Sequence, residues 1–243
     1  MIDKTVTDAA VAVAGIPDGA TVMIGGFGRA GQPAELIDAL IDQGASGLTI
    51  VNNNAGNGDT GLAALLAAGR VRKIICSFPR QHDSWVFDGL YRAGEIELEL
   101  VPQGNLAERI RAAGAGIGAF FSPTGVGTQL ADGKELREIE GRTYVLEHPI
   151  RADFALVSAL RADRWGNLVY RETARNFGPV MATAATTTIV QVDELVPLGR
   201  IDPETVVTPG IFVDRVVAVG ERAWLRDGGF VGGVDVDGRV AGL

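Results

Sequence analysis

Short apolar runs alternate along the chain with longer segments whose apolar residues recur at helical spacing. Thr21–Ile24 is typical of a buried strand, and Leu36, Ile37 and Leu40 then share one helical face that ends at Gly44. The repeated pattern predicts further strands at 48–51, 73–78, 95–101, 119–122, 143–146, 154–160 and 188–192. It predicts helices at 5–14, 62–68, 106–113 and 177–185, and another that begins at Gln81. Alternating strands and helices indicate an α/β fold with a largely parallel open sheet and helices on both faces.

Three local signals refine this pattern. Within 95–101, three glutamates alternate with apolar residues, which predicts a strand with one solvated face or a strand at the sheet edge. Residues 168–170 follow a turn and are expected to pair back as a hairpin arm. Asn105 is a candidate N-cap for the helix at 106–113.

The pattern continues without an internal boundary until it fades near the C-terminus. We therefore predict one α/β domain over residues 1–219 and a glycine-rich extension over residues 220–243. With 243 residues, 47% of them hydrophobic and 21% charged, the chain has the composition of a globular protein with a substantial core.

Charge and cysteine content narrow the class of protein. The formal net charge of −8 argues against a nucleic-acid-binding surface, and it means that an anionic ligand must be held by local features. The single cysteine, Cys76, lies in an apolar run and predicts a buried thiol in a reducing compartment. The first residues lack the features of a secretory signal, and no stretch approaches the ~20 apolar residues of a membrane span. We expect a cytoplasmic protein without a membrane association.

A glycine-rich loop, Gly25 to Gly31, joins the strand at 21–24 to a helix expected to begin at Pro33. A strand, a glycine loop and a helix in this order can offer backbone N–H groups to an anion or a developing oxyanion. Arg29 is the only charged side chain in the loop. It can meet a phosphate or a carboxylate, or it can simply be solvated.

Two other interpretations of this loop remain open. Residues 26–31 fit the dinucleotide-binding spacing G-x-G-x-x-G, which requires an acid at the end of the following strand. Here that strand runs into Asn52, Asn53 and Asn54, with no acid. The glycines can also serve only to bring a helix and a strand close together.

Other strand ends carry further candidates. Gln103 follows the strand at 95–101, where its amide can hold a carbonyl group or can be a solvated loop side chain. A second glycine loop at 123–128, with Gly125 and Gly127, can offer backbone N–H groups. The Asn- and Gly-rich segment 52–61 is either a ligand-binding loop or a flexible connection.

The sequence shows no complete catalytic apparatus. It lacks the metal-binding pattern H-E-x-x-H, a cysteine pair and an aspartate cluster with metal spacing, so we expect no metal site. It also lacks the G-x-S-x-G pattern of serine hydrolases. Two loops that can bind an anion, without an evident nucleophile, suggest half of an active site.

The stretch from residue 18 to residue 33 resembles the signature of the 3-oxoacid coenzyme A transferases, in the component usually called A or alpha. The matching positions are Asp18, Gly19, Val22 to Ile24, Gly25, Gly26, Phe27, Gly31 and Pro33. Segments 101–109, 121–128, 162–167 and 174–177 also resemble this component, and the likeness extends to about residue 217.

This resemblance implies an enzyme without a permanently bound cofactor that uses a coenzyme A thioester as substrate. It places coenzyme binding at Gly25, Gly26, Phe27, Gly28, Arg29, Ala30 and Gly31. The family's nucleophile is a glutamate in a Ser-Glu-Asn-Gly motif on the partner B-subunit, and this chain lacks that motif. The resemblance thus implies a hetero-oligomer with such a partner and no catalytic nucleophile in this chain, with Gln103, Gly125 and Gly127 as candidates to stabilise an oxyanion.

The resemblance favours transfer from succinyl-CoA to 3-oxoadipate, in aromatic catabolism, over transfer to acetoacetate. Two other functions remain open. A relative with the same fold can hydrolyse a coenzyme A thioester, and a non-enzymatic sensor can bind a phosphorylated metabolite through the same loop.

Overall fold

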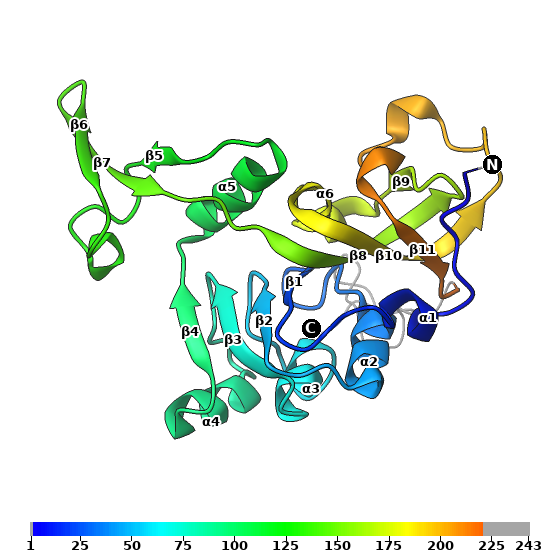
Figure 1. Ribbon diagram of the computed structural model, residues 1–243, viewed down its shortest axis with the longest axis horizontal. Helices are drawn as coiled ribbons and strands as arrows, with labels where there is room; N and C mark the ends of the chain where they lie inside the picture. The colour runs from blue at the N-terminus through cyan, green and yellow to red at the C-terminus, as the bar shows by residue number, and fades with distance from the viewer. Residues whose placement is uncertain (1, 221–243) are drawn as a thin grey trace, which may run out of the picture.

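A computed structural model describes residues 2–220 of the chain (Figure 1). Beyond Gly220, the predicted C-terminal extension lies outside the described residues.

Eight strands of the described chain form one sheet, in the order β11-β10-β8-β1-β2-β3-β4, with β9 paired to β8. The strands are β1 (Thr21–Ile24), β2 (Leu48–Val51), β3 (Val71–Cys76), β4 (Glu97–Leu100), β8 (Ala152–Asp163), β9 (Leu168–Val169), β10 (Ala185–Val196) and β11 (Arg215–Ala218). Every pairing along the path from β11 to β4 is parallel, and β9 pairs antiparallel with β8. The predicted α/β class and the hairpin arm at 168–170 are confirmed.

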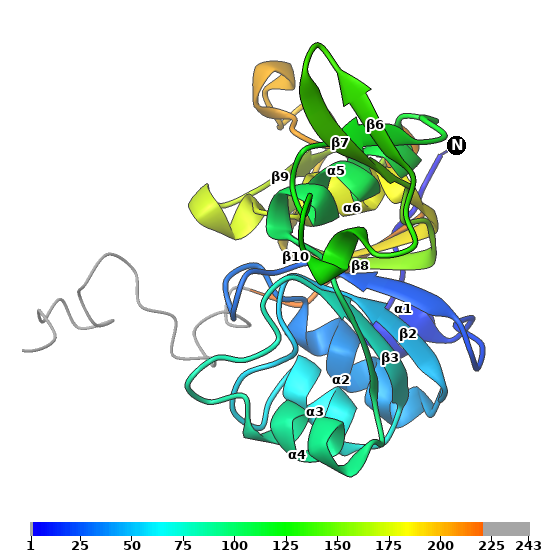
Figure 2. The same cartoon turned by 90° about the vertical axis from the view of Figure 1, so that its left-hand side faces the viewer.

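Helices cover both faces of this sheet (Figures 1 and 2). The helices are α1 (Ala9–Val13), α2 (Ala34–Gln43), α3 (Leu62–Ala67), α4 (Trp85–Ala93), α5 (Gln103–Gly114) and α6 (Gly178–Ala184). Buried residues of α1 to α4 share one core with Val22 and Ile24 of β1, whereas α5 and α6 share a second core with Met23. Because successive strand residues point to opposite faces, the short apolar run of β1 contributes to both cores.

The edge position of β4 explains its alternating glutamates. Glu97 pairs with Arg72 at 3.0 Å, and Glu99 pairs with Lys73 at 2.6 Å, both across the β3–β4 pair. Charged side chains on an edge strand discourage pairing with another chain. The sequence-based prediction of an edge strand is confirmed.

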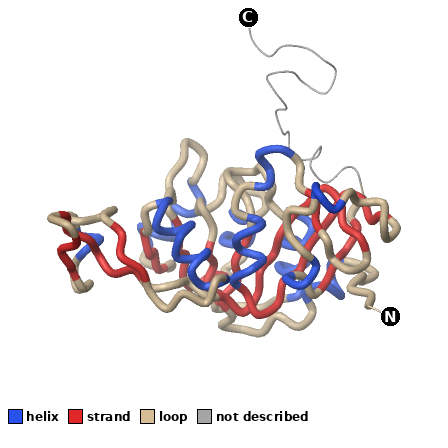
Figure 3. The backbone as a smooth tube through the Cα atoms, turned by 90° about the horizontal axis from the view of Figure 1, so that it is seen from above, coloured by secondary structure: helices blue, strands red, loops and turns tan. Residues whose placement is uncertain are grey.

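A second sheet, with three antiparallel strands in the order β5-β7-β6, projects from the body of the molecule (Figures 1 and 3). Its strands are β5 (Phe120–Ser122), β6 (Leu136–Ile139) and β7 (Arg142–Glu147). The apolar pattern predicted β5 and β7 but missed β6. All four residues of β6 are exposed, so this strand has no buried face to produce a recognisable pattern.

Some predicted helix ends were wrong. The first helix starts at Ala9 and not at residue 5, because Asp8 is its N-cap and accepts a hydrogen bond from the Val11 amide. Helix α5 starts at Gln103, with Pro102 at the N-cap position. Asn105 is therefore an interior residue of α5, and its buried side chain bonds to other elements instead of capping its own helix.

Cys76 is a buried residue of β3, as predicted, and burial raises the pKa of its thiol to about 12. None of the helices within residues 2–220 combines the length and the apolar character needed to span a membrane.

Candidate functional site

The first glycine loop lies where the order of the sheet reverses. From β1, the chain adds β2, β3 and β4 on one side, whereas β8, β10 and β11 lie on the other side. Open α/β sheets bind ligands outside the carboxyl ends of their strands at such a switch point. Residues 25–31 leave the carboxyl end of β1 at this position, beside β8, where the Gly25 amide donates to the Leu156 carbonyl at 2.9 Å.

Two asparagines from distant parts of the chain hold this loop in shape. The Gly26 amide donates to Asn176 Oδ1 at 3.2 Å, and the Gly28 amide donates to Asn54 Oδ1 at 2.8 Å. Asn176 Nδ2 in turn donates to the Ala30 carbonyl at 2.8 Å. The conformation of the loop is thus fixed by the protein itself.

These bonds leave fewer loop amides for a ligand than the sequence suggested. The amides of Phe27 and Ala30 also bond to each other's carbonyl groups, at 3.0 and 3.2 Å. At the start of α2, the Leu36 amide donates to Gln191 Oε1 at 3.1 Å, on the buried side chain of Gln191 in β10. Coenzyme binding by residues 25–31 stays a prediction; the side chains of Phe27 and Arg29 in this loop are exposed.

Gly31 packs this loop against the segment before α6. A Cβ atom at Gly31 would lie 2.1 Å from the Ala174 carbonyl oxygen, and its φ of +73° is one that side chains rarely adopt. Ala174 belongs to the short 3₁₀ helix η2 (Glu172–Arg175). Only glycine therefore permits this close approach between the loop and η2.

A chain of side-chain amides runs from the glycine loop across the strand ends to Gln103. Asn54 Oδ1 accepts from the Gly28 amide and from Asn53 Nδ2, the latter at 3.1 Å. Asn53 Oδ1 accepts from Ser77 Oγ and from Gln103 Nε2, both at 2.7 Å. The structure thus joins the ends of β1, β2, β3 and β4 through groups that the sequence left as separate loops.

The first donor in this chain determines the direction of every later bond. A backbone amide can only donate, so Asn54 must present its oxygen to Gly28. Asn53 must then donate to that same oxygen, which leaves Asn53 Oδ1 to face Gln103. Gln103 consequently donates one Nε2 hydrogen to Asn53 and retains its second N–H and its Oε1.

The second glycine loop is held by a different part of the fold. Thr128 donates to the Gly125 carbonyl through both its amide and its hydroxyl, at 3.1 and 2.7 Å, just before the 3₁₀ helix η1 (Gln129–Ala131). Asn105 Nδ2 of α5 donates to the Thr124 carbonyl at 3.3 Å. Among residues 2–220, the series of hydrogen bonds from the first loop to Gln103 does not include Gly125 or Gly127. Their role in stabilising an oxyanion stays a prediction.

A buried ionic cluster, not found by sequence analysis, ties the small sheet to α5. Glu147 on β7 accepts from Lys134 Nζ at 2.8 Å and from Asn105 Nδ2 at 3.1 Å, and Arg109 lies 3.8 Å away. The Glu147 side chain is 3% exposed. A carboxylate this deeply buried requires such partners, so the cluster has a sufficient structural explanation.

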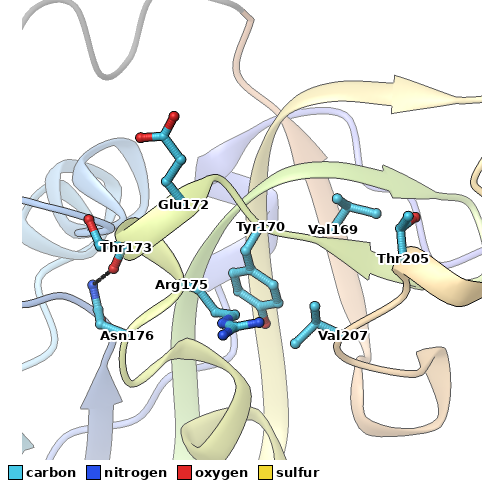
Figure 4. A pocket seen from close by; sticks show the side chains of 8 residues that line it. All are labelled: Val169, Tyr170, Glu172, Thr173, Arg175, Asn176, Thr205 and Val207. Atoms are coloured by element: carbon cyan, nitrogen blue, oxygen red, sulfur yellow. Dashed lines mark hydrogen bonds between the residues drawn. The ribbon is translucent and has the colours of Figure 1, made fainter. Parts of the chain in front are cut away.

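A pocket of about 800 Å³ is lined in part by η2 residues and by Asn176, which also bonds to the glycine loop (Figure 4). Its lining includes Val169, Tyr170, Arg175, Asn176 and Val207. Burial raises the pKa of Tyr170 to about 12, and its hydroxyl lies 2.8 Å from Thr208 Oγ1, so this phenol is neutral at physiological pH. The sequence pattern gave no sign of the pocket, because its lining comes from segments on both sides of α6 and β10.

The groups assembled at the strand ends are hydrogen-bonding groups rather than nucleophiles. Side-chain amides can orient a carbonyl group or stabilise negative charge on its oxygen, but they do not form acyl intermediates. Within residues 2–220, no three His, Cys, Asp or Glu residues are grouped so as to hold a metal ion.

Comparison with known proteins identifies close relatives. The chain is 70% identical to the A-subunit of 3-oxoadipate CoA-transferase from Pseudomonas putida, over 92% of this chain and 96% of the relative. It is 53% identical to the A-subunit of succinyl-CoA:3-ketoacid coenzyme A transferase from Xanthomonas campestris pv. campestris, over 88% of each chain.

Solved structures with a similar fold include the acyl-CoA transferase YdiF of Escherichia coli O157:H7, in its thioester complex with CoA, with a TM-score of 0.79 and 26% identity. The match covers 89% of this chain and spans 47% of the YdiF chain. The model of the family described as coenzyme A transferase matches residues 6–219. The chain therefore belongs to the coenzyme A transferase family.

Proposed function

We propose that this chain is the non-nucleophilic A-subunit of an enzyme that moves coenzyme A from succinyl-CoA to 3-oxoadipate, and that a separate B-subunit carries the catalytic glutamate. The observation that carries the proposal is the 70% identity to the Pseudomonas putida A-subunit over 92% of this chain. The lone, buried Cys76 fits an enzyme of the reducing cytoplasm.

The proposed chemistry is covalent acyl transfer. The partner's glutamate carboxylate attacks the thioester carbonyl of succinyl-CoA, which forms a mixed anhydride and releases the coenzyme A thiolate. The thiolate attacks the glutamyl carbonyl, releases succinate and leaves a glutamyl thioester. The carboxylate of 3-oxoadipate then attacks this thioester, and the released thiolate attacks the carbonyl of the bound acid, which regenerates the glutamate.

Each of these additions places negative charge on a carbonyl oxygen, and this chain supplies the groups that receive it. Gln103 is held by Asn53 with one N–H free, which suits a donor that is oriented before the reaction. Loss of one such donor typically costs about 3 kcal/mol of transition-state stabilisation.

Reconstitution tests the proposal. We expect the isolated chain to be inactive, and the chain co-purified with a partner that carries Ser-Glu-Asn-Gly to transfer coenzyme A from succinyl-CoA to 3-oxoadipate. Full activity of the isolated chain would refute the proposal that a separate B-subunit carries the catalytic glutamate. Faster turnover with acetoacetate would overturn the assigned acceptor, and release of coenzyme A without any acceptor would favour hydrolysis.

A further inference from the structure

The pocket beside η2 is lined by Arg175, whose positive charge is not paired with any described residue. Within residues 2–220, the Arg175 guanidinium has no hydrogen-bond or ion-pair partner, whereas Arg109 contacts both Glu99 and the His148 carbonyl. In Figure 4 the Arg175 side chain extends toward Tyr170 and Val207, and Glu172 points away from them. One end of the pocket thus combines a positive charge with an apolar wall.

The protein fixes the position of this arginine through the glycine loop. Asn176, the next residue, bonds to the Gly26 amide and the Ala30 carbonyl, and Gly31 packs against the Ala174 carbonyl. The first residue of η2, Glu172, has a φ of +42°, in the region that non-glycine residues rarely adopt. Strained backbone of this kind persists where the surrounding structure enforces it, and it is concentrated at functional sites.

We propose that this pocket is an anion subsite, in which Arg175 binds a carboxylate or phosphate group of a reactant whose thioester end lies toward the glycine loop. The inference rests on the proposed function, since both proposed reactants carry anionic groups remote from the reacting carbonyl. A planar guanidinium forms paired hydrogen bonds with either group. The volume of about 800 Å³ is within the range of small-molecule sites.

The net charge of −8 favours anion binding at a local cation over binding by the field of the whole chain. The field of the whole chain opposes the approach of an anion, so binding depends on a cation that is not neutralised by a neighbour. The Glu172 carboxylate points away from Tyr170 and Val207, toward which the Arg175 side chain extends, so the anionic group is expected at the arginine end of the pocket (Figure 4).

Kinetics of the assembled enzyme test the subsite. We compare wild type with Arg175→Gln, Arg175→Lys and, as a matched control, Arg151→Gln, an exposed arginine that precedes β8. Arg175→Gln is expected to raise the KM of one substrate about 10- to 100-fold with a small change in kcat. Arg175→Lys should restore part of the loss, and Arg151→Gln should behave as wild type.

Substrate analogues distinguish the two sources of the anion. If Arg175 binds the remote carboxylate of the acid, the KM effect disappears with a 3-oxoacid that has only its reacting carboxylate. If it binds the 3′-phosphate of the coenzyme, the effect disappears with the thioester of 3′-dephospho-coenzyme A. KM values of Arg175→Gln within twofold of wild type for both substrates would overturn the subsite. An inactive wild-type assembly would instead refute the proposed function.

Discussion

The two glycine loops have similar compositions but different surroundings. Loop 25–31 lies at the switch point of the main sheet, with Gly26 and Gly28 bonded to Asn176 and Asn54. Loop 123–128 lies beside the small antiparallel sheet, where its backbone is held by Thr128 and by Asn105 of α5. The two loops thus differ in the groups that hold them and not in their glycine content: the first bonds to residues beside the main sheet, the second to residues around the small sheet.

We expect the largest difference between the two loops when one glycine in each loop is replaced by alanine. Gly31→Ala introduces a Cβ atom 2.1 Å from the Ala174 carbonyl oxygen at a φ of +73°. Overpacking and backbone strain together predict a loss of about 2–5 kcal/mol in the free energy of unfolding. Urea denaturation, followed by tryptophan fluorescence, measures the loss.

Gly127→Ala is the matched control, because Gly127 has a φ of +76° and no atom within 4 Å of the position that the new methyl group would occupy. It should lose only about 1–2 kcal/mol, from backbone strain alone. Equal losses in the two variants would show that the contact between the first loop and η2 does not distinguish the loops.

A second comparison uses the buried asparagine associated with each loop. Asn53→Leu removes the link between Asn54 and Gln103 and leaves buried polar groups without partners, at a cost of about 1–3 kcal/mol each. We expect the folded, assembled variant to lose about 100-fold or more in kcat, since Gln103 is no longer oriented.

Asn105→Leu is expected to destabilise the small sheet by a similar amount and to retain a kcat within a few-fold of wild type. Asn105 bonds to Ser122, Thr124 and Glu147, and none of these bonds involves Asn53, Asn54 or Gln103. Activity assays below the unfolding temperatures of Asn53→Leu and Asn105→Leu separate a loss of kcat from a loss of stability. An equally large loss of kcat in Asn105→Leu would place the second loop in the catalytic site.

The smallest expected effect concerns the ion pairs that Glu99, on the edge strand β4, forms with Lys73 of β3 and Arg109 of α5. Burial alone would raise the pKa of Glu99, but the Lys73 ammonium and the Arg109 guanidinium outweigh it and hold this pKa below its usual value. A lowered pKa in the folded state stabilises the protein above the pKa of the unfolded chain. This contribution is lost as the pH falls through the folded-state pKa.

Glu99→Gln should therefore lower the free energy of unfolding at pH 7, by less than about 1 kcal/mol because the pair is partly solvated. It should also reduce the loss of stability on acidification. Glu97→Gln is the control, since its side chain is 61% exposed. Urea denaturation at several pH values measures both variants, and parallel pH profiles for wild type and Glu99→Gln would contradict the assignment.

Much of the fold was predictable because it follows from local spacing. The apolar runs located β1, β2 and β10, and Gly44 marked the end of α2 with a left-handed φ of +96°. The missed strand β6 has no buried residue, and Asn105 was misassigned because a helix interior and an N-cap look alike when the partners of a polar side chain are unknown.

The candidate site was predictable only in pieces. Gln103 and residues 25–31 were identified separately, each from its position after a strand. The bonds that join them through Asn53 and Asn54 connect residues 26 and 50 positions apart, and the bond from Gly26 to Asn176 spans 150 positions. Arg175 lies in segment 174–177, which the family resemblance singled out, but nothing in the sequence indicated the pocket that it lines.

The sequence by itself determined the order of strands and helices, the α/β class and the family, because periodicity and a long fixed-spacing motif are properties of neighbouring residues. The tertiary structure alone decided which loops meet, which loop amides are already bonded, and that Arg175 lines a pocket without a partner among the described residues. Those outcomes depend on the strand order β8-β1-β2-β3-β4, which brings the carboxyl ends of distant segments to one edge of the sheet.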